Sequence, residues 1–161
     1  MWLYEGKVKK AIHTYKYHLR KSHGKAFAQE LYQFYTKHVG WKVDVITCVP
    51  LHPSKMKERS FNQAAYLATL LGEKLEVKVD NNLLVRTKNT RPQKDLTDIE
   101  RIVNLENAFE MNKQSGCQNQ RILIVDDIYT TGSTIDNCAK ILLKQGAKDV
   151  YFLTLAIGKG Y

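Results

Sequence analysis

Two adjacent carboxylates, Asp126 and Asp127, stand between an apolar run and a group of hydroxyl-bearing residues, an arrangement suited to chemistry. The apolar run, 122–125, is typical of a strand buried on both faces, because three of its four residues are β-branched. The segment 130–134 follows, with Gly132 at its centre, and a helical apolar pattern comes after it. This order of strand, acidic pair, turn and helix predicts a binding site at the carboxyl end of the strand.

The turn at 130–134 suits the phosphate group of a phosphorylated sugar. Backbone N–H groups at a helix N-terminus stabilise an anion, and Gly132 has no Cβ to keep a phosphate away from the backbone. Side-chain hydroxyls supply further donors. Carboxylates would repel phosphate, so we expect Asp126 and Asp127 to face ribose hydroxyls or Mg²⁺. The hydroxyl-bearing residues of the turn are Thr130, Thr131, Ser133 and Thr134.

The segment from Ile122 to Thr134 resembles the phosphoribosyl-pyrophosphate (PRPP) motif of type I phosphoribosyltransferases. That motif is an apolar run, two acidic residues, two variable residues and then T-T-G-S-T, and all thirteen positions match. The alternative is an ordinary strand, turn and helix with acidic turn residues. Two other phosphate-binding patterns, G-x-x-x-x-G-K-[ST] and G-x-G-x-x-G after a strand, do not occur in the sequence.

The length of 161 residues predicts a single domain, 1–161, and a hydrophobic content of 43% is sufficient for a core. No apolar run approaches the ~20 residues that cross a membrane, so we expect no membrane insertion. The N-terminus has no signal-peptide pattern. Cys48, Cys117 and Cys138 form no C-x-x-C pair, so neither a zinc site nor a disulfide framework is predicted, and a reducing, cytoplasmic environment fits best.

The net charge of +9 is unevenly distributed along the chain. Residues 1–62 hold 12 Lys and Arg against 4 Asp and Glu, whereas residues 63–161 hold 13 against 12. All five histidines also lie in the first part. A basic N-terminal half indicates a polyanionic partner, either nucleic acid or a highly phosphorylated ligand. The alternative is a solvated basic face with no partner.

Hydrophobic periodicity along the chain predicts an α/β fold, with a Rossmann-like parallel sheet and helices on both of its faces. Gly40 and Gly72 are expected to end two of the helices. A basic loop is expected between the first long strand and the helix that follows it. The predicted elements are N-terminal helices within about 1–40, the second of them at 25–38; strands at 43–49, 83–85, 109–111, 122–125 and 150–156; and helices at 64–71, 97–103 and from 135 onward.

Further motifs resemble those of ComF-type proteins, the phosphoribosyltransferase-like proteins of bacterial DNA uptake. V-P-L-H-P followed by R-S-F-N-Q-A is similar to a signature of that group, with Ser60 where the signature has Gly. Tyr4-x-Gly6 and Lys16-Tyr17 also resemble the group. The resemblance spans nearly the whole chain and implies the type I phosphoribosyltransferase fold, with a sheet core at about 43–85 and 109–157 and a hood at about 86–106. Full-length members usually carry an N-terminal Cys-rich zinc module, and this chain starts at about the point where such a module would end.

The resemblance also implies roles for individual residues. Asp126 and Asp127 would contact the ribose 2′- and 3′-hydroxyls, directly or through Mg²⁺-bound water, and would stabilise a cationic sugar during transfer. Pyrophosphate would contact the backbone of Leu51 and His52, with Arg59 supplying positive charge from the same loop. The implied phosphate-binding residues are Thr130, Thr131, Gly132, Ser133 and Thr134 for the 5′-phosphate, Leu51 and His52 for pyrophosphate, and Lys88 and Arg91 from the hood.

Three functions follow from these patterns. The first is a competence protein that binds PRPP with Mg²⁺ and assists uptake of single-stranded DNA, with a helicase and a DNA-processing protein as partners. The second is a metabolic phosphoribosyltransferase that transfers ribose 5-phosphate to a small acceptor. The third is a PRPP-sensing module without catalysis. Thr130 stands where hypoxanthine–guanine members have a third acidic residue, and a hydroxyl is a poor general base, which weakens the case for a purine acceptor.

Overall fold

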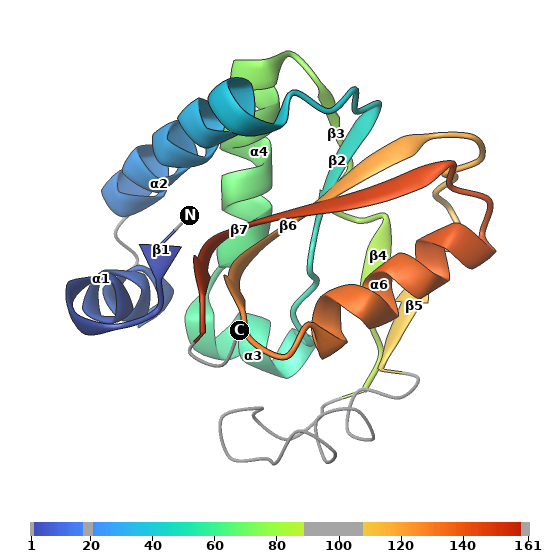
Figure 1. Cartoon of the computed structure of the whole chain (residues 1–161). Helices are drawn as coiled ribbons and strands as arrows, with labels where there is room; N and C mark the ends of the chain where they lie inside the picture. The colour runs from blue at the N-terminus through green and yellow to red at the C-terminus, as the bar shows by residue number, and fades with distance from the viewer. Residues whose placement is uncertain (1, 18–20, 89–107, 159–161) are drawn as a thin grey trace.

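A five-stranded parallel sheet forms the centre of the molecule in the computed structural model, which describes residues 2–17, 21–88 and 108–158 (Figure 1). The strand order is β1-β7-β6-β2-β3. The predicted fold class, a parallel α/β sheet with flanking helices, is therefore confirmed. The strands of this sheet are β1 (Trp2–Leu3), β2 (Val45–Cys48), β3 (Lys78–Val79), β6 (Arg121–Tyr129) and β7 (Asp149–Ile157).

The long central strands carry the pattern that the sequence predicts. Strand β6 pairs with β7 along its length and with β2 from Ile122 to Val125. Strands β1 and β3 were not predicted. Each has two residues, which is too short for any hydrophobic period to be recognised, and each is defined by its pairing with β7 or β2.

The helices cover the sheet in two layers (Figure 1). Leu123 and Val125 of β6 belong to a core cluster with α1 (Gly6–Tyr17), α2 (Lys21–Phe34) and α4 (Gln63–Leu75). Ile122 and Ile124 belong to a second cluster with α6 (Ser133–Lys144) on the opposite face. Successive side chains of a strand point to opposite faces, so a run of four apolar residues serves both layers.

The basic segment after β2 was predicted to be a loop, and this prediction is wrong. The segment contains the helix α3 (Pro53–Arg59). His52 caps it, because its Nδ1 accepts a hydrogen bond from the Ser54 N–H at 3.2 Å, and Pro53 occupies a position where a missing N–H costs nothing. Ser60 ends the helix with a φ of 64°. A left-handed conformation at this position explains why the related signature has glycine there.

The prediction for Gly72 is wrong. Helix α4 continues past it to Leu75 and ends at Glu76, which adopts a left-handed φ of 55°. Gly72 instead lies where the helix packs closely on the following strand, since a Cβ there would stand 2.1 Å from Cγ2 of Val79. The prediction for Gly40 is confirmed: it ends the π-helical turn η1 (Tyr35–Val39) with a φ of 60°.

Strands β4 (Leu84–Arg86) and β5 (Phe109–Met111) form a separate antiparallel pair. They were predicted as strands of the sheet core, but they lie outside the parallel sheet and contribute to the core cluster next to α6. They flank the predicted hood at about 86–106. Most of that hood, with Arg91 and the predicted helix at 97–103, lies outside the described residues.

No helix in the described ranges is both long and apolar enough to cross a membrane.

Candidate functional site

The acidic pair lies within β6 rather than after it, because pairing with β7 continues to Tyr129. The two carboxylates therefore point to opposite faces of the sheet. Asp126 shares the side of Ile122 and Ile124, next to α6. Asp127 shares the side of the first core cluster, next to α1. The sequence analysis placed the acidic pair after a strand that ends at 125, and the extended pairing corrects this boundary.

Asp127 forms an ion pair with Lys16 of α1, and 2.9 Å separate Oδ2 of the carboxylate from Nζ of the lysine. The Lys16 side chain is 17% exposed and that of Asp127 is 12% exposed, so the pair is largely shielded from water. Burial opposes the charge on Lys16, but the Coulombic attraction and the hydrogen bond of Asp127 outweigh it and raise its pKa. Lys16 is thus a charged member of the site.

Asp126 lies in a different environment. Burial, followed by the negative charge of Asp127, raises the pKa of Asp126 to about 7. The backbone N–H of Asp127 donates a 2.8 Å hydrogen bond to Oδ1 of Asp126, and the positive charges of Lys16 and Arg86 also favour its ionised form. A bound cation would favour the ionised form of Asp126 in the same way as Lys16 and Arg86 do. Asp126 is therefore a suitable carboxylate to bind a metal ion or a cationic ligand.

The turn after β6 leads into α6 through Gly132, which caps the helix with a φ of 80°. Thr131 and Ser133 contact each other through their hydroxyl oxygens at 3.0 Å. The first N–H groups of an α-helix have no partner within the helix and can bind an anion. A Cβ on Gly132 would stand 2.5 Å from the Tyr129 hydroxyl oxygen, so the ring of Tyr129 provides a second reason for glycine here.

Three further predicted residues belong to the β2–α4 connection. Leu51 and His52 follow the carboxyl end of β2, which pairs with β6 beside the acidic residues. The side chain of His52 caps α3. Arg59 donates a 3.1 Å hydrogen bond to the Tyr17 hydroxyl, and its guanidinium carbon lies 5.0 Å from the centre of that ring. Arg59 is therefore attached to α1, next to Lys16.

Lys16 was not among the predicted site residues. It was noted only because Lys16-Tyr17 resembles ComF-type sequences. A signal was present, because Lys16 lies four residues after the fully buried Ile12 and so shares its helix face. A lysine on the buried face of a helix is stabilised when a carboxylate lies nearby, so its position indicated an acidic partner.

The predicted residue Lys88 is exposed and lies at the end of a described range.

The residues present fit Mg²⁺ only in part. The described ranges contain no group of three His, Cys, Asp or Glu side chains that could hold a metal ion. Mg²⁺ usually binds through one or two carboxylates together with ligand oxygens and water, so a single carboxylate such as Asp126 is a sufficient protein contribution. Asp127 already has an ammonium group as its partner. A bound Mg²⁺ would supply positive charge beside the phosphate oxygens of a ligand.

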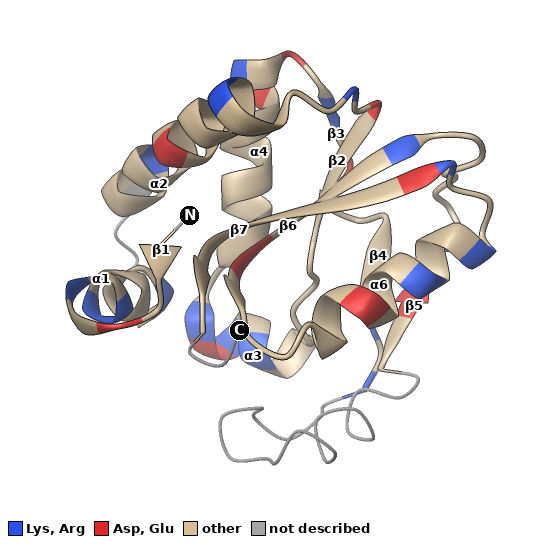
Figure 2. Cartoon of the chain, in the orientation of Figure 1, with Lys and Arg blue, Asp and Glu red and all other residues tan. Residues whose placement is uncertain are grey.

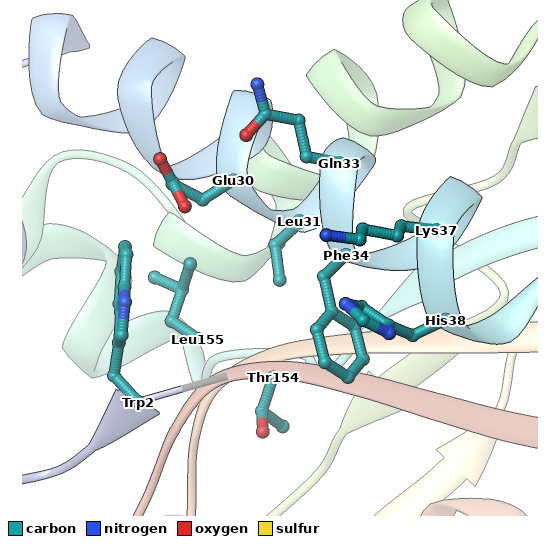
Figure 3. Close-up of a pocket in the computed structure, with 9 residues that line it drawn as sticks. All are labelled: Trp2, Glu30, Leu31, Gln33, Phe34, Lys37, His38, Thr154 and Leu155. Carbon is teal, nitrogen blue, oxygen red and sulfur yellow. The ribbon is translucent and has the colours of Figure 1, made fainter.

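A cavity of about 210 Å³ lies elsewhere, between the α2–η1 segment and β7. Figure 3 shows the side chains of Trp2, Leu31, Phe34 and Leu155 around it, with Thr154 pointing away to the other side of β7. None of the residues that line it belongs to the predicted site. The cavity is therefore separate from the turn and the acidic pair.

Comparison with known proteins places these features in a family context. Residues 18–160 match the family described as the phosphoribosyl transferase domain. Among curated proteins, "Competence protein F" of Haemophilus influenzae is 34% identical over 114 residues, which cover 70% of this chain and 50% of the relative. "DNA utilization protein YhgH" of Escherichia coli K12 is 37% identical, covering 66% and 46%. "Competence protein ComFC" of Bacillus subtilis is 27% identical, covering 91% and 58%.

The chain thus spans about half the length of the curated relatives it matches. Among solved structures, an adenine phosphoribosyltransferase from Thermoanaerobacter pseudethanolicus aligns with a TM-score of 0.52 at 15% identity, covering 86% of this chain and 82% of that one. A glutamine PRPP amidotransferase from B. subtilis also aligns with a TM-score of 0.52, at 16% identity, covering 82% and 26%. At these identities the likeness concerns the fold alone.

Proposed function

Because the chain belongs to the phosphoribosyl transferase domain family, we propose that it binds PRPP, together with Mg²⁺, at the acidic pair and the turn 130–134. One observation carries this proposal: the turn after β6 reaches the N-terminus of α6 through Gly132 at a φ of 80°, and β6 itself carries the two carboxylates near its end. A helix N-terminus favours phosphate, and carboxylates accept hydrogen bonds from ribose hydroxyls.

In this proposal the 5′-phosphate binds the backbone and hydroxyl groups of the turn. The ribose contacts one carboxylate directly and the other through Mg²⁺-bound water, because Asp126 and Asp127 lie on opposite faces of β6. Pyrophosphate lies beyond the carboxyl end of β2, near Leu51 and His52, where Arg59 supplies positive charge. Lys88 and Arg91 add charge from the hood. The location agrees with the general rule that ligands of open α/β sheets bind beyond the carboxyl ends of the strands.

The same residues would stabilise charge during transfer of the ribosyl group. A carboxylate next to the sugar stabilises the positive charge that develops as the bond to pyrophosphate breaks, and cations stabilise the departing pyrophosphate. Removing one such contact typically costs roughly 3–4 kcal/mol of activation free energy. Thr130 carries no carboxylate, so this position offers no general base to an acceptor. We therefore propose PRPP binding as the primary property of this site.

We further propose a role in DNA uptake, supported by the basic N-terminal half and by the names of the curated relatives. Figure 2 shows Lys and Arg on α1 and α3, two helices joined by the contact of Arg59 with Tyr17. The exposed cations of these helices would contact the phosphates of single-stranded DNA, with a competence helicase and a DNA-processing protein as partners. The exposed lysines are Lys7, Lys9, Lys10 and Lys57.

The test of the primary proposal is a calorimetric titration with PRPP, with and without Mg²⁺. Wild type is expected to bind only with Mg²⁺, and Asp126→Asn is expected to bind at least about tenfold more weakly. Asp149→Asn, at the opposite end of the sheet from the carboxyl edge, is the matched control and should bind as wild type does. A folded wild-type protein that does not bind PRPP would refute the proposal.

Two additional measurements separate the alternatives. Pyrophosphate release with a panel of small acceptors would favour a metabolic transferase, whereas PRPP binding without turnover would favour a sensor. For the role in DNA uptake, the logarithm of the association constant for single-stranded DNA should fall linearly with the logarithm of the salt concentration, and Lys7→Gln/Lys10→Gln should make this slope shallower. Equal slopes for the variant and wild type would remove α1 from the DNA-binding surface.

A further inference from the structure

We propose that Lys16 acts as a built-in cation of this site: it occupies Asp127 in place of a divalent metal ion, and it leaves Asp126 as the motif carboxylate that reaches Mg²⁺. In this arrangement Asp127 is a fixed acceptor for a ligand hydroxyl, and Lys16 is its positioning residue. The identity of the ligand rests on the function proposed above, but the partition between the two carboxylates rests on contacts within the chain.

The first support is the contact itself. Nζ of Lys16 lies 2.9 Å from Oδ2 of Asp127, and both side chains are mostly buried. An ammonium group carries three donors and no acceptor, so it satisfies one carboxylate oxygen without occupying the other. Oδ1 of Asp127 is thus left to accept a hydrogen bond from a hydroxyl group. A metal ion at the same carboxylate would have to approach a positive charge within a few ångströms.

The second support is that α1 is held in place independently of Asp127. The side-chain amide of Gln63 donates a 3.1 Å hydrogen bond to the carbonyl oxygen of Lys16, and the Tyr15 hydroxyl donates a 2.9 Å bond to the carbonyl of Gln63. The ring of Tyr15 also packs edge-on against Phe61 with 5.8 Å between ring centres. Gln63 is 1% exposed and Tyr15 is fully buried, so these contacts fix the last turn of α1 on the start of α4.

The third support is the neighbouring cation. Arg59, at the end of α3, donates to the hydroxyl of Tyr17, the residue after Lys16. Its Nε is buried and has no hydrogen-bond partner within the described ranges. The charge of Arg59 also acts on Lys16, so two cations lie together at the ends of α1 and α3. The charges of Lys16 and Arg86 act on Asp126 as well, so the two carboxylates differ in the direct contact that Lys16 makes with Asp127.

The fourth support is the divergence of the two carboxylates. Asp126 and Asp127 are consecutive residues of one strand and point to opposite faces, so one metal ion cannot take both carboxylates as direct ligands without a local change of β6. The face of Asp127 is taken by Lys16. The face of Asp126 lies toward α6, whose N-terminal turn is the proposed phosphate site, and Mg²⁺ binds readily between a carboxylate and phosphate oxygens.

The test uses Mn²⁺ alone as a probe for the metal, followed by electron paramagnetic resonance. Lys16→Gln frees Asp127 and is expected to bind Mn²⁺ roughly tenfold or more tightly than wild type, because a like charge has been removed. Lys16→Arg should match wild type, and so should Lys9→Gln on the exposed face of α1. Lys16→Gln/Asp127→Asn should lose the gain. A folded Lys16→Gln protein with unchanged or weaker Mn²⁺ affinity would overturn the proposal.

Two additions keep the test decisive. If Lys16→Gln does not fold, Lys16→Met/Asp127→Asn replaces a buried ion pair by a neutral pair, which proteins often tolerate. This variant should keep the Mn²⁺ affinity of wild type, and a loss of tenfold or more would overturn the proposal. The same proteins are then titrated with PRPP and Mg²⁺. Failure of wild type to bind PRPP would refute the proposed function, while the Mn²⁺ result would still decide the role of Lys16.

Discussion

Gly132 provides a direct test of how the turn before α6 is built. Its φ of 80° lies in the region that side chains disfavour, and a Cβ would stand 2.5 Å from the hydroxyl oxygen of Tyr129 and 3.0 Å from Cζ of the same ring. The ring cannot move aside freely, because it stacks on Phe152 with 5.0 Å between ring centres. Gly132→Ala is therefore expected to be clearly destabilising.

The magnitude has two parts. The left-handed conformation costs an alanine roughly 1–2 kcal/mol, and forcing an extra methyl group into a packed position costs roughly 1–3 kcal/mol. We expect a loss of about 3 kcal/mol in the free energy of unfolding, which corresponds to a decrease in Tm of roughly 6–12 °C for a domain of this size. The packing part depends on Tyr129, whereas the conformational part does not.

The assay is urea unfolding of Gly132→Ala, Tyr129→Phe and the double variant. Tyr129→Phe removes the atom nearest to the new methyl group, so the double variant should recover about 1 kcal/mol or more of the packing cost. Gly116→Ala is the matched control, because a Cβ there would meet nothing within 4 Å, and its stability should change by less than about 0.5 kcal/mol. The reasoning is refuted if Gly132→Ala is as stable as the control, or if the two substitutions are additive.

Three further predictions concern the scaffold. Hydrogen bonds from the side chain and backbone of Arg121 hold the pKa of Asp44 well below its usual range. This pair therefore stabilises the protein above about pH 4, and the stabilisation is lost as the pH falls below that value. Asp44→Asn should flatten the acid side of a plot of Tm against pH. Gly72→Ala should destabilise by about 1–3 kcal/mol despite the higher helix propensity of alanine, with partial recovery on adding Val79→Ala, measured by urea unfolding. Tyr15→Phe should cost about 1 kcal/mol in the same assay, because a buried carbonyl at the start of α4 loses a donor; no change would show that this hydrogen bond is not formed.

Local sequence patterns were sufficient for the main strands and for the family. Four apolar residues at 122–125 predicted a strand buried on both faces, and β6 has that burial. The resemblance to ComF-type phosphoribosyltransferases is confirmed by the family match and by the names of the curated relatives. Such patterns are informative because strand alternation and turn chemistry act over a few residues, so they are visible in any short window of sequence. The single-domain organisation, the zinc module and the assigned site residues stay predictions.

Local patterns failed where a distant contact decides the structure. Gly72 was expected to end a helix, since glycine is common there, but it is needed for close packing against Val79. The segment after β2 was expected to be a loop, although His52 and Pro53 are good helix-start residues. Its basic composition is typical of an exposed binding segment, whereas the start signals at His52 and Pro53 predict a helix.

The residues available for chemistry follow from the sequence alone: an acidic pair, a glycine-containing turn and a basic N-terminal half. How the acidic pair is used depends on the tertiary structure. Continued pairing of β6 with β7 sends Asp126 and Asp127 to opposite faces, and contacts with α4 bring Lys16 from the start of the chain to Asp127. These outcomes depend on strand pairing and helix packing between segments far apart in the sequence, which no local pattern of residues records.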